Sequence, residues 1–256
     1  MNNVTLWSVN WNQQKALELM LRSYIMHNYN HEPLNVMIVD NGSTDGSREW
    51  LEENGIPFLS LQRNVGHERA LQFSYNMINT PLAMLCDSDI KFKFSIEPYI
   101  QLLNEFDSVG EVIEGEEYDG HPLMPRVAPW FHLFKIQKMK DLGVCCWRGT
   151  DAWQYDVGSW YYDKMKELGL KNYRISKPFY EQVGGDYGRY FHFSQVSTDS
   201  SIHGVSSEVS ARRNHIFDEV RDMPKTADFR AMLSGINEQW GNDKIDKEIE
   251  KGWVCP

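Results

Sequence analysis

The sequence has few cysteines and no long apolar segment. Its four cysteines, Cys86, Cys145, Cys146 and Cys255, show no Cys-x-x-Cys spacing, so a structural zinc site or a secreted disulfide scaffold is not expected. No stretch approaches the roughly 18 uninterrupted apolar residues of a transmembrane helix, and the N-terminus lacks the pattern of a signal peptide. We therefore expect a soluble, cytoplasmic protein with reduced thiols and no transmembrane segment.

Basic residues are also in short supply. Lys and Arg number 26 against 36 Asp and Glu, and the formal net charge is −10. A general nucleic-acid or anionic-membrane binder needs a basic surface field, so we expect no nucleic-acid partner. An anionic ligand would need local help from a metal ion or from helix N-termini.

Strands and helices alternate along the first 90 residues. Apolar runs of strand length cover 4–9, 34–39, 58–61 and 82–86, and helical spacing covers 16–24, 47–53 and 69–78. This alternation predicts an α/β fold, a single Rossmann-like domain with a mainly parallel central sheet flanked by helices. Ligands of such sheets bind at the carboxyl ends of the strands. The polar residues that directly follow predicted strands are Asn10, Asp40, Asn64 and Asp87.

The second half of the chain is less regular. We predict a strand over 130–136, a helix over 159–168, a strand over 173–175 and a Ser-rich loop over 194–210. Apolar residues at loosely helical spacing predict a terminal helix over 228–253. This helix would carry Trp240 and Trp253, which could pack on a second subunit. A homodimer through the C-terminal extension is therefore left open.

Two acidic turns at strand ends are the candidates for binding a metal ion and a nucleotide. Asp87 and Asp89 follow a buried strand, and strand alternation would point both carboxylates into the crevice, where hard oxygens suit Mg²⁺ or Mn²⁺ bound to a diphosphate. Asp40 begins a tight turn, Asp40 to Gly46, and can accept hydrogen bonds from a base or a ribose. Each motif alone is equally compatible with an ordinary turn and helix cap.

Three motifs together narrow the interpretation. Val39 to Gly46, Asn64-Val65-Gly66 and Asp87-Ser88-Asp89, in this order and separation, resemble glycosyltransferase family 2, the inverting enzymes of the A-type glycosyltransferase fold. The resemblance covers residues 4–95 and becomes loose after that. It implies that the nucleotide-sugar contacts are Asn10, Trp11, Asp40, Arg63, Asn64, Gly66, Asp87 and Ser88.

The resemblance also implies individual roles. Asp40 would hold the base, and Arg63 would lie near the base or the diphosphate. Asp87 would contact the ribose or the metal, and Asp89 would be a metal ligand, with Mn²⁺ or Mg²⁺ as the cofactor. A histidine downstream often completes the metal shell in this fold, and His203 and His192 are the two candidates.

Inverting transfer needs a carboxylate that takes the proton of the acceptor hydroxyl. In the family this base stands at the N-terminus of a helix, which favours Asp156 here, with Asp151 as the next candidate. Arg126 and Trp130 are candidates for the acceptor cleft, and Trp130 is equally compatible with a structural aromatic. A Gln-x-x-Arg-Trp signature is absent, which argues against a processive polysaccharide synthase.

We therefore predict three parts in one domain: 1–95 binds the nucleotide sugar, 96–220 holds the acceptor and the catalytic base, and 221–256 is a helical extension. The predicted activity is metal-dependent transfer of one sugar from a nucleotide-diphosphate sugar, UDP-linked by preference, to a glycan, lipid-linked or protein acceptor. Peripheral association with a membrane that carries the acceptor is left open. A non-catalytic nucleotide-sugar or glycan-binding protein is the alternative, and a nucleotidyltransferase is disfavoured because residues 4–20 contain no Gly.

Overall fold

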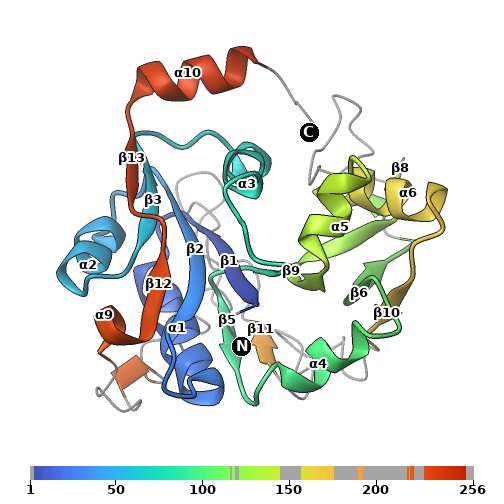
Figure 1. The fold of residues 1–256 in the computed structure, drawn as a ribbon. Helices are drawn as coiled ribbons and strands as arrows, with labels where there is room; N and C mark the ends of the chain where they lie inside the picture. Colours follow the sequence, from blue (N-terminus) through green and yellow to red (C-terminus); the bar gives the residue numbers. More distant parts are fainter. Residues whose placement is uncertain are drawn as a thin grey trace.

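The computed structural model describes residues 3–115, 117–118, 121–144, 157–175, 190–192, 218, 220–221 and 228–251. Within these ranges one large sheet runs through the molecule in the order β10-β6-β9-β4-β1-β2-β3-β13, with β12 paired beside it to β2. Figure 1 shows the helices arranged on both sides of this sheet. The predicted α/β class with a central sheet is confirmed.

The first half of the chain builds the centre of the sheet. Its strands are β1 (Val4–Asn10), β2 (Leu34–Asn41), β3 (Phe58–Leu61), β4 (Leu82–Cys86) and β5 (Ile90–Phe92). Its helices are α1 (Gln14–Asn28), α2 (Ser47–Glu53) and α3 (His67–Tyr75). β1 pairs in parallel with β2 and β4, and β2 pairs in parallel with β3. The carboxyl ends of these strands therefore share one edge of the sheet.

The second half widens the sheet on the β4 side. It contributes α4 (Glu97–Leu102), β6 (Ser108–Ile113), β7 (Glu117–Tyr118), β8 (His121–Pro122), β9 (Arg126–Phe134), α5 (Ile136–Asp141), α6 (Ser159–Glu167), β10 (Asn172–Arg174) and β11 (Tyr190–His192). β9 runs antiparallel to both β4 and β6, so its first residues lie at the same edge as the end of β4. The predicted strand at 130–136 is displaced, because Ile136 begins α5.

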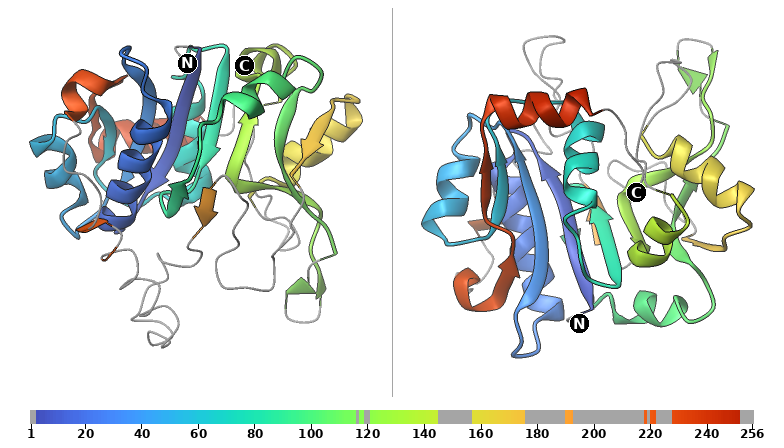
Figure 2. Two further views of the ribbon diagram at one scale, coloured as in Figure 1. Left: turned by 90° about the horizontal axis from the view of Figure 1, so that it is seen from below. Right: turned by 45° about the horizontal axis from the view of Figure 1, so that its top comes forward.

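Helices lie on both faces of the sheet (Figure 2), and an apolar cluster packs on each face. Leu17, Leu21 and Tyr24 of α1 pack with Leu51 and Phe229 on one face. The other face carries α3, α5, α6 and the C-terminal helix, with Leu71, Met139, Met165 and Ile245 in one cluster. Strand alternation divides the sheet between these clusters, since Leu6 belongs to the first cluster and Trp7 to the second. None of the helices within the described ranges has the length and hydropathy needed to cross a membrane.

The prediction of one helix over 228–253 is wrong. This segment contains α9 (Phe229–Met232), β12 (Leu233–Gly235), β13 (Glu238–Trp240) and α10 (Asn242–Glu250). β12 pairs in parallel with the beginning of β2, and β13 pairs in parallel with β3. The spacing of apolar residues was compatible with a helix, but Gly235 lies where a Cβ atom would approach the carbonyl oxygen of Val36 to 2.3 Å.

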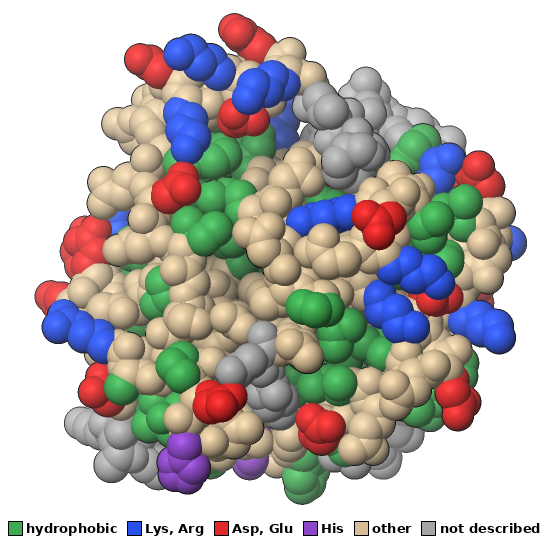
Figure 3. Space-filling view, viewed as in Figure 1, with side chains coloured by type: hydrophobic (Ala, Val, Ile, Leu, Met, Phe, Trp, Pro, Cys, Tyr) green, Lys and Arg blue, Asp and Glu red, His purple; other side chains and the backbone are tan. Residues whose placement is uncertain are grey.

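Trp240 is therefore a core residue rather than part of an exposed helix. It is buried and its ring lies 5.4 Å from that of Phe73. Trp253 lies outside the described residues, and a homodimer through this extension stays a prediction. Acidic and basic side chains are interspersed over α10 at the top of the space-filling view (Figure 3). By strand pairing, this segment is joined to the half of the chain that contains residues 1–95.

Candidate functional site

The candidate site lies where the carboxyl ends of β1, β2 and β4 meet. Asn10 and Asp40 are direct neighbours in the parallel register of β1 and β2, so two residues 30 positions apart in the sequence share one place in the sheet. Both side chains are buried. The expectation that the sheet brings these residues to one edge is met by the pairing of the strands.

Asp40 is held from two sides. Its Oδ2 atom accepts a hydrogen bond from the backbone N–H of Ser43 at 3.3 Å. The same atom forms an ion pair with Nη2 of Arg48 at 3.3 Å. Its other carboxylate oxygen, Oδ1, is buried and has no hydrogen-bond partner within the described ranges, and neither has Oδ1 of Asn10. Two neighbouring residues at the strand ends thus each carry a buried acceptor atom without a hydrogen-bond partner among the described residues.

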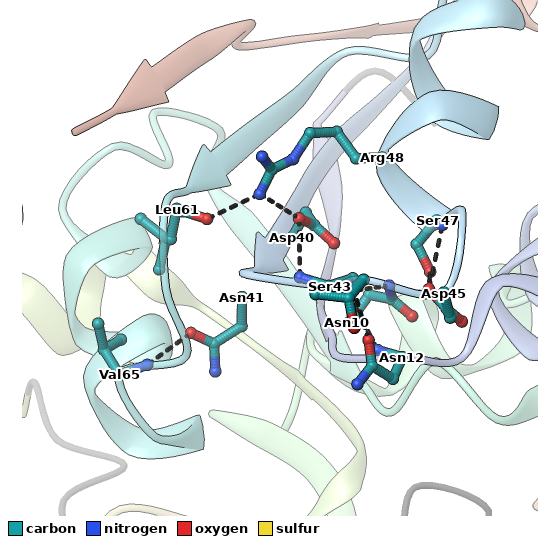
Figure 4. A network of polar contacts seen from close by, with 11 residues as sticks. Asn10, Asn12, Asp40, Asn41, Ser43, Asp45, Ser47, Arg48, Leu61 and Val65 are labelled. Carbon is teal, nitrogen blue, oxygen red and sulfur yellow. Dashed lines mark hydrogen bonds and ion pairs between the residues drawn. The ribbon is translucent and has the colours of Figure 1, made fainter. Parts of the chain in front are cut away.

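The loop after β1 and the turn after β2 are bonded to each other (Figure 4). Ser43 Oγ accepts from Nδ2 of Asn10 at 3.3 Å and from the backbone N–H of Asn12 at 3.0 Å. The Asn12 Oδ1 atom accepts in turn from the N–H of Thr44 at 2.7 Å. These contacts fix the Asn10 amide, and they make the two loops one unit.

Asp45 ties two helices to this unit. Its Oδ1 accepts from the backbone N–H of Ser47 at 3.0 Å, at the start of α2, while Oδ2 accepts from the N–H of Gln14 at 2.9 Å, at the start of α1. A carboxylate at a helix N-terminus satisfies an N–H group that has no partner in the helix and interacts favourably with the helix dipole. The sequence reasoning did not assign Asp45 a role; it lies one residue before Gly46, the N-cap of α2.

The loop after β3 is closed by amide pairs. Asn64 Oδ1 accepts from Nδ2 of Asn41 at 3.0 Å and from the N–H of Gly66 at 2.8 Å, and Asn41 Oδ1 accepts from the N–H of Val65 at 3.0 Å. Gly42 lets the backbones touch: its φ is +74°, and a Cβ atom there would lie 2.4 Å from the carbonyl carbon of Arg63. Asn64 and Gly66 thus shape the loop at the end of β3.

Arg63 contacts the C-terminal helix. Its guanidinium is ion-paired with Asp246 and donates to Oδ1 of Asn242 at 3.1 Å, both on α10. Within the described ranges it is not bonded to the strand-end residues of β1, β2 or β4. Its suggested place near the base or diphosphate stays a prediction, and Trp11, half-buried in the loop after β1, has the same standing.

The Asp-Ser-Asp segment forms a turn between β4 and β5. Asp87 is half-buried, whereas Ser88 and Asp89 are buried. The sequence reasoning had assumed that strand alternation points both carboxylates into the crevice. Because β4 ends at Cys86, strand alternation does not set the directions of these side chains. Ser88 Oγ donates to Oε1 of Gln13 at 3.3 Å, which connects this turn to the loop after β1.

Arg126 and Trp130 lie on β9, beside the end of β4. Cys86, the last residue of β4, is the register partner of Phe131, so Trp130 is one residue from the position opposite the end of β4. Trp130 packs partly against the apolar core and donates from Nε1 to Oε2 of Glu111 at 3.2 Å. Arg126 is buried and is the register partner of Ile113.

The remaining candidates are placed only in part. Asp151, Asp156 and His203 lie outside the described residues. For His192 the backbone is described: β11 runs antiparallel to β5, and His192 is the register partner of Ile90, the residue after Asp89. His132 on β9 is buried in the core against Phe134, with ring centroids 4.9 Å apart. Burial lowers the pKa of His132 to about 3.

The model of glycosyl transferase family 2 matches residues 9–149, which is more than half of the 256-residue chain. The chain belongs to glycosyl transferase family 2. All three turns that form the site, after β1, β2 and β4, lie in or at the border of the matched range. The resemblance that the three sequence motifs carried is thereby confirmed.

Several known proteins are similar to parts of this family 2 domain. It is 27% identical over 116 residues to a teichoic acid poly(glycerol phosphate) polymerase of Staphylococcus epidermidis; the match covers 43% of this chain and 16% of the relative. A mannosyltransferase of Pyrobaculum calidifontis, PcManGT, superposes with a TM-score of 0.53 at 18% identity over 70% of this chain and 58% of the other. S. aureus TarS superposes with a TM-score of 0.51 at 13% identity, and the match covers 89% of this chain and 68% of the TarS chain. At these identities the likeness shows the fold.

The acidic turn of the family 2 domain has the donor atoms that a divalent cation needs. Two carboxylates and a hydroxyl within three residues are hard oxygen ligands of the kind Mg²⁺ and Mn²⁺ prefer. Across the described ranges, no group of three His, Cys, Asp or Glu side chains is placed to hold a metal ion. Mg²⁺ sites in proteins commonly take one or two carboxylates, with substrate phosphates and water as the remaining ligands.

Proposed function

We propose that this domain is a glycosyltransferase that moves one sugar, with inversion, from a nucleotide-diphosphate sugar to a glycan, lipid-linked or protein acceptor. The observation that carries the proposal is the convergence of three family motifs at one sheet edge. Asp40 is the strand neighbour of Asn10 there, Asn64 accepts a hydrogen bond from Asn41, and Ser88 is bonded to Gln13 in the loop after Asn10. Ligands of parallel α/β sheets bind at this edge.

The buried acceptor atoms support a nucleoside ligand. Oδ1 of Asp40 and Oδ1 of Asn10 can accept from the N–H of a base and from a ribose hydroxyl. Uracil and guanine present a ring N–H at the edge where cytosine and adenine present a lone pair, so an acceptor pair favours uracil or guanine. We propose a UDP-linked donor, with a GDP-linked donor as the comparison; PcManGT was solved with GDP-Man and Mn²⁺.

The chemistry is divided between the two halves of the chain. A Mn²⁺ or Mg²⁺ ion held by Asp87 and Asp89 would offset charge on the leaving diphosphate. Asp156, with Asp151 as the second candidate, is the proposed base that takes the acceptor proton. His192 and His203 are the proposed additional metal ligands, and the register of His192 beside Ile90 supports the former.

The acceptor side is proposed from β9. Arg126 and Trp130 lie on the strand beside the acidic turn, which supports a role in acceptor binding. The low cysteine content supports a cytoplasmic location. Association with a membrane depends on whether the acceptor is lipid-linked.

The test is sugar release or transfer from UDP- and GDP-sugars in Mn²⁺, for the wild type, Asp89→Ala and the control Asp243→Ala. Asp243 is exposed on α10. We expect Asp89→Ala to lower turnover at least roughly a hundredfold, equivalent to about 3 kcal/mol of transition-state stabilisation. The control should keep its activity, and a chelator should abolish it in the wild type. Donor binding without turnover would instead support the non-catalytic alternative.

A further inference from the structure

The Asp40 carboxylate is buried away from solvent. Its side chain is fully buried at the end of β2, and burying a charge is costly unless the charge is paired and hydrogen-bonded. Within the described ranges, Arg48 is the cation paired with it. The guanidinium is thus the balancing charge for the residue that we propose reads the base.

The contact also has a direction. Nη2 of Arg48 bonds Oδ2 of Asp40 at 3.3 Å and the carbonyl oxygen of Leu61, the last residue of β3, at 3.0 Å. Arg48 comes from the first turn of α2 and reaches across the ends of β2 and β3, as Figure 4 shows. Because Oδ2 is taken by Arg48 and by the N–H of Ser43, the oxygen left to accept from a ligand is Oδ1.

We propose that Arg48 is a positioning residue for donor recognition: it holds the Asp40 carboxylate so that Oδ1 accepts the ring N–H of the donor base. The inference rests on the proposed function and adds to it the residue that sets base selectivity. Arg48 does not touch the reacting atoms. Its loss should therefore change donor binding, and with it KM, and should leave kcat nearly unchanged.

Arg48 also connects α2 to β3, so a purely structural role has to be separated from a positioning role. Arg22 provides a matched control, because it forms a 2.9 Å ion pair with the buried carboxylate of Glu18, on α1. Both arginines lie on helices of the same sheet face and balance buried acids. Arg22→Met should lower stability without changing base recognition.

The experiment measures the binding of UDP and of 3-methyl-UDP, which lacks the ring N–H, by calorimetry in Mn²⁺. Wild type, Arg48→Met, Arg48→Lys and Arg22→Met are compared. We expect the wild type to prefer UDP over 3-methyl-UDP by roughly tenfold or more, the usual range for a hydrogen bond to a charged group. Arg48→Met should lose most of this preference, with UDP binding weakened roughly tenfold and 3-methyl-UDP binding nearly unchanged.

The conservative variant keeps the test decisive if Arg48→Met does not fold. Arg48→Lys retains the charge and should keep UDP binding and the preference within about threefold of the wild type. An unchanged preference in Arg48→Met, an equal weakening of both nucleotides, or loss of the preference in Arg48→Lys would overturn the inference. A folded wild type that neither binds nor turns over UDP- or GDP-linked compounds would instead overturn the proposed function.

Discussion

His132 should make the stability of this domain depend on pH between neutral and mildly acidic conditions. The imidazole is fully buried on β9, stacked on Phe134 and edge-on to Tyr161 at 5.1 Å. Gly110 on the neighbouring strand makes room for the ring, since a Cβ atom there would lie 2.6 Å from Cδ2 of His132. Burial lowers the pKa of His132 from 6.5 to about 3, because a charged imidazolium would lose its solvation.

The sign and the size of this pH dependence follow from the difference between the pKa of His132 in the unfolded and in the folded chain. Below pH 6.5 the unfolded chain takes up a proton at this position, whereas the folded chain does not until pH 3 is approached. The free energy of unfolding is therefore not reduced by this residue above pH 6.5. As the pH falls from there towards 3, proton uptake by the unfolded chain lowers the free energy of unfolding by about 1.4 kcal/mol per pH unit. Between pH 7 and pH 5 the loss is about 2 kcal/mol.

Urea unfolding of the wild type and of His132→Gln at pH 7 and pH 5 measures this loss. Gln has no titrating group, so its packing cost appears at both pH values and cancels in the difference. The wild type should lose about 2 kcal/mol more than His132→Gln between the two conditions. His31→Gln, at an exposed position, is the control and should behave as the wild type. Equal losses in the wild type and His132→Gln would refute the reasoning.

Two further substitutions test the backbone of the site. Gly42→Ala should lower the free energy of unfolding by at least about 1–2 kcal/mol from its left-handed φ alone, and the clash with the backbone of Arg63 should also raise the donor KM; an unchanged urea midpoint would contradict this. Asp45→Ala removes the acceptor for the N–H groups of Gln14 and Ser47 and should cost roughly 1–2 kcal/mol. Its thermal midpoint should fall by several degrees, whereas Asp45→Asn, which keeps one acceptor oxygen, should recover part of the loss.

The parts of the fold that sequence reasoning found are those whose signals are local. Apolar runs ending in polar residues predicted β1, β2, β3 and β4 closely, because a strand buried on both faces needs a continuous apolar segment. β6 was not predicted because Glu111 interrupts its apolar pattern, although this residue is buried and accepts from Trp130. β12 and β13 were missed because pairing with β2 and β3 depends on residues roughly 200 positions away.

The candidate site divides in the same way. The sequence placed Asp40 at the end of one strand and Asp87 directly after another, and the parallel pairing of β1 with β2 and β4 brings these strand ends to one edge. The roles of Asp40, Asp87 and Asp89 in binding stay a prediction. Arg48 was not predicted, because its role depends on the path of its side chain across two strand ends. Arg63 was expected at the nucleotide, but its partners are on α10, an element that the sequence reasoning had merged into one long helix.

The strand pairing of the C-terminal segment also bears on how the protein is made. Ser234 on β12 bonds Asn35 on β2, although 199 positions separate them, and β13 covers the outer side of β3. During synthesis the strands that carry Asp40 and the loop after β3 are exposed long before these partners leave the ribosome. Such non-local pairing slows folding and leaves unpaired strand edges open to association. The nascent chain therefore passes through a long interval in which β2 and β3 lack these partner strands, and this interval is where chaperone contact or aggregation would act.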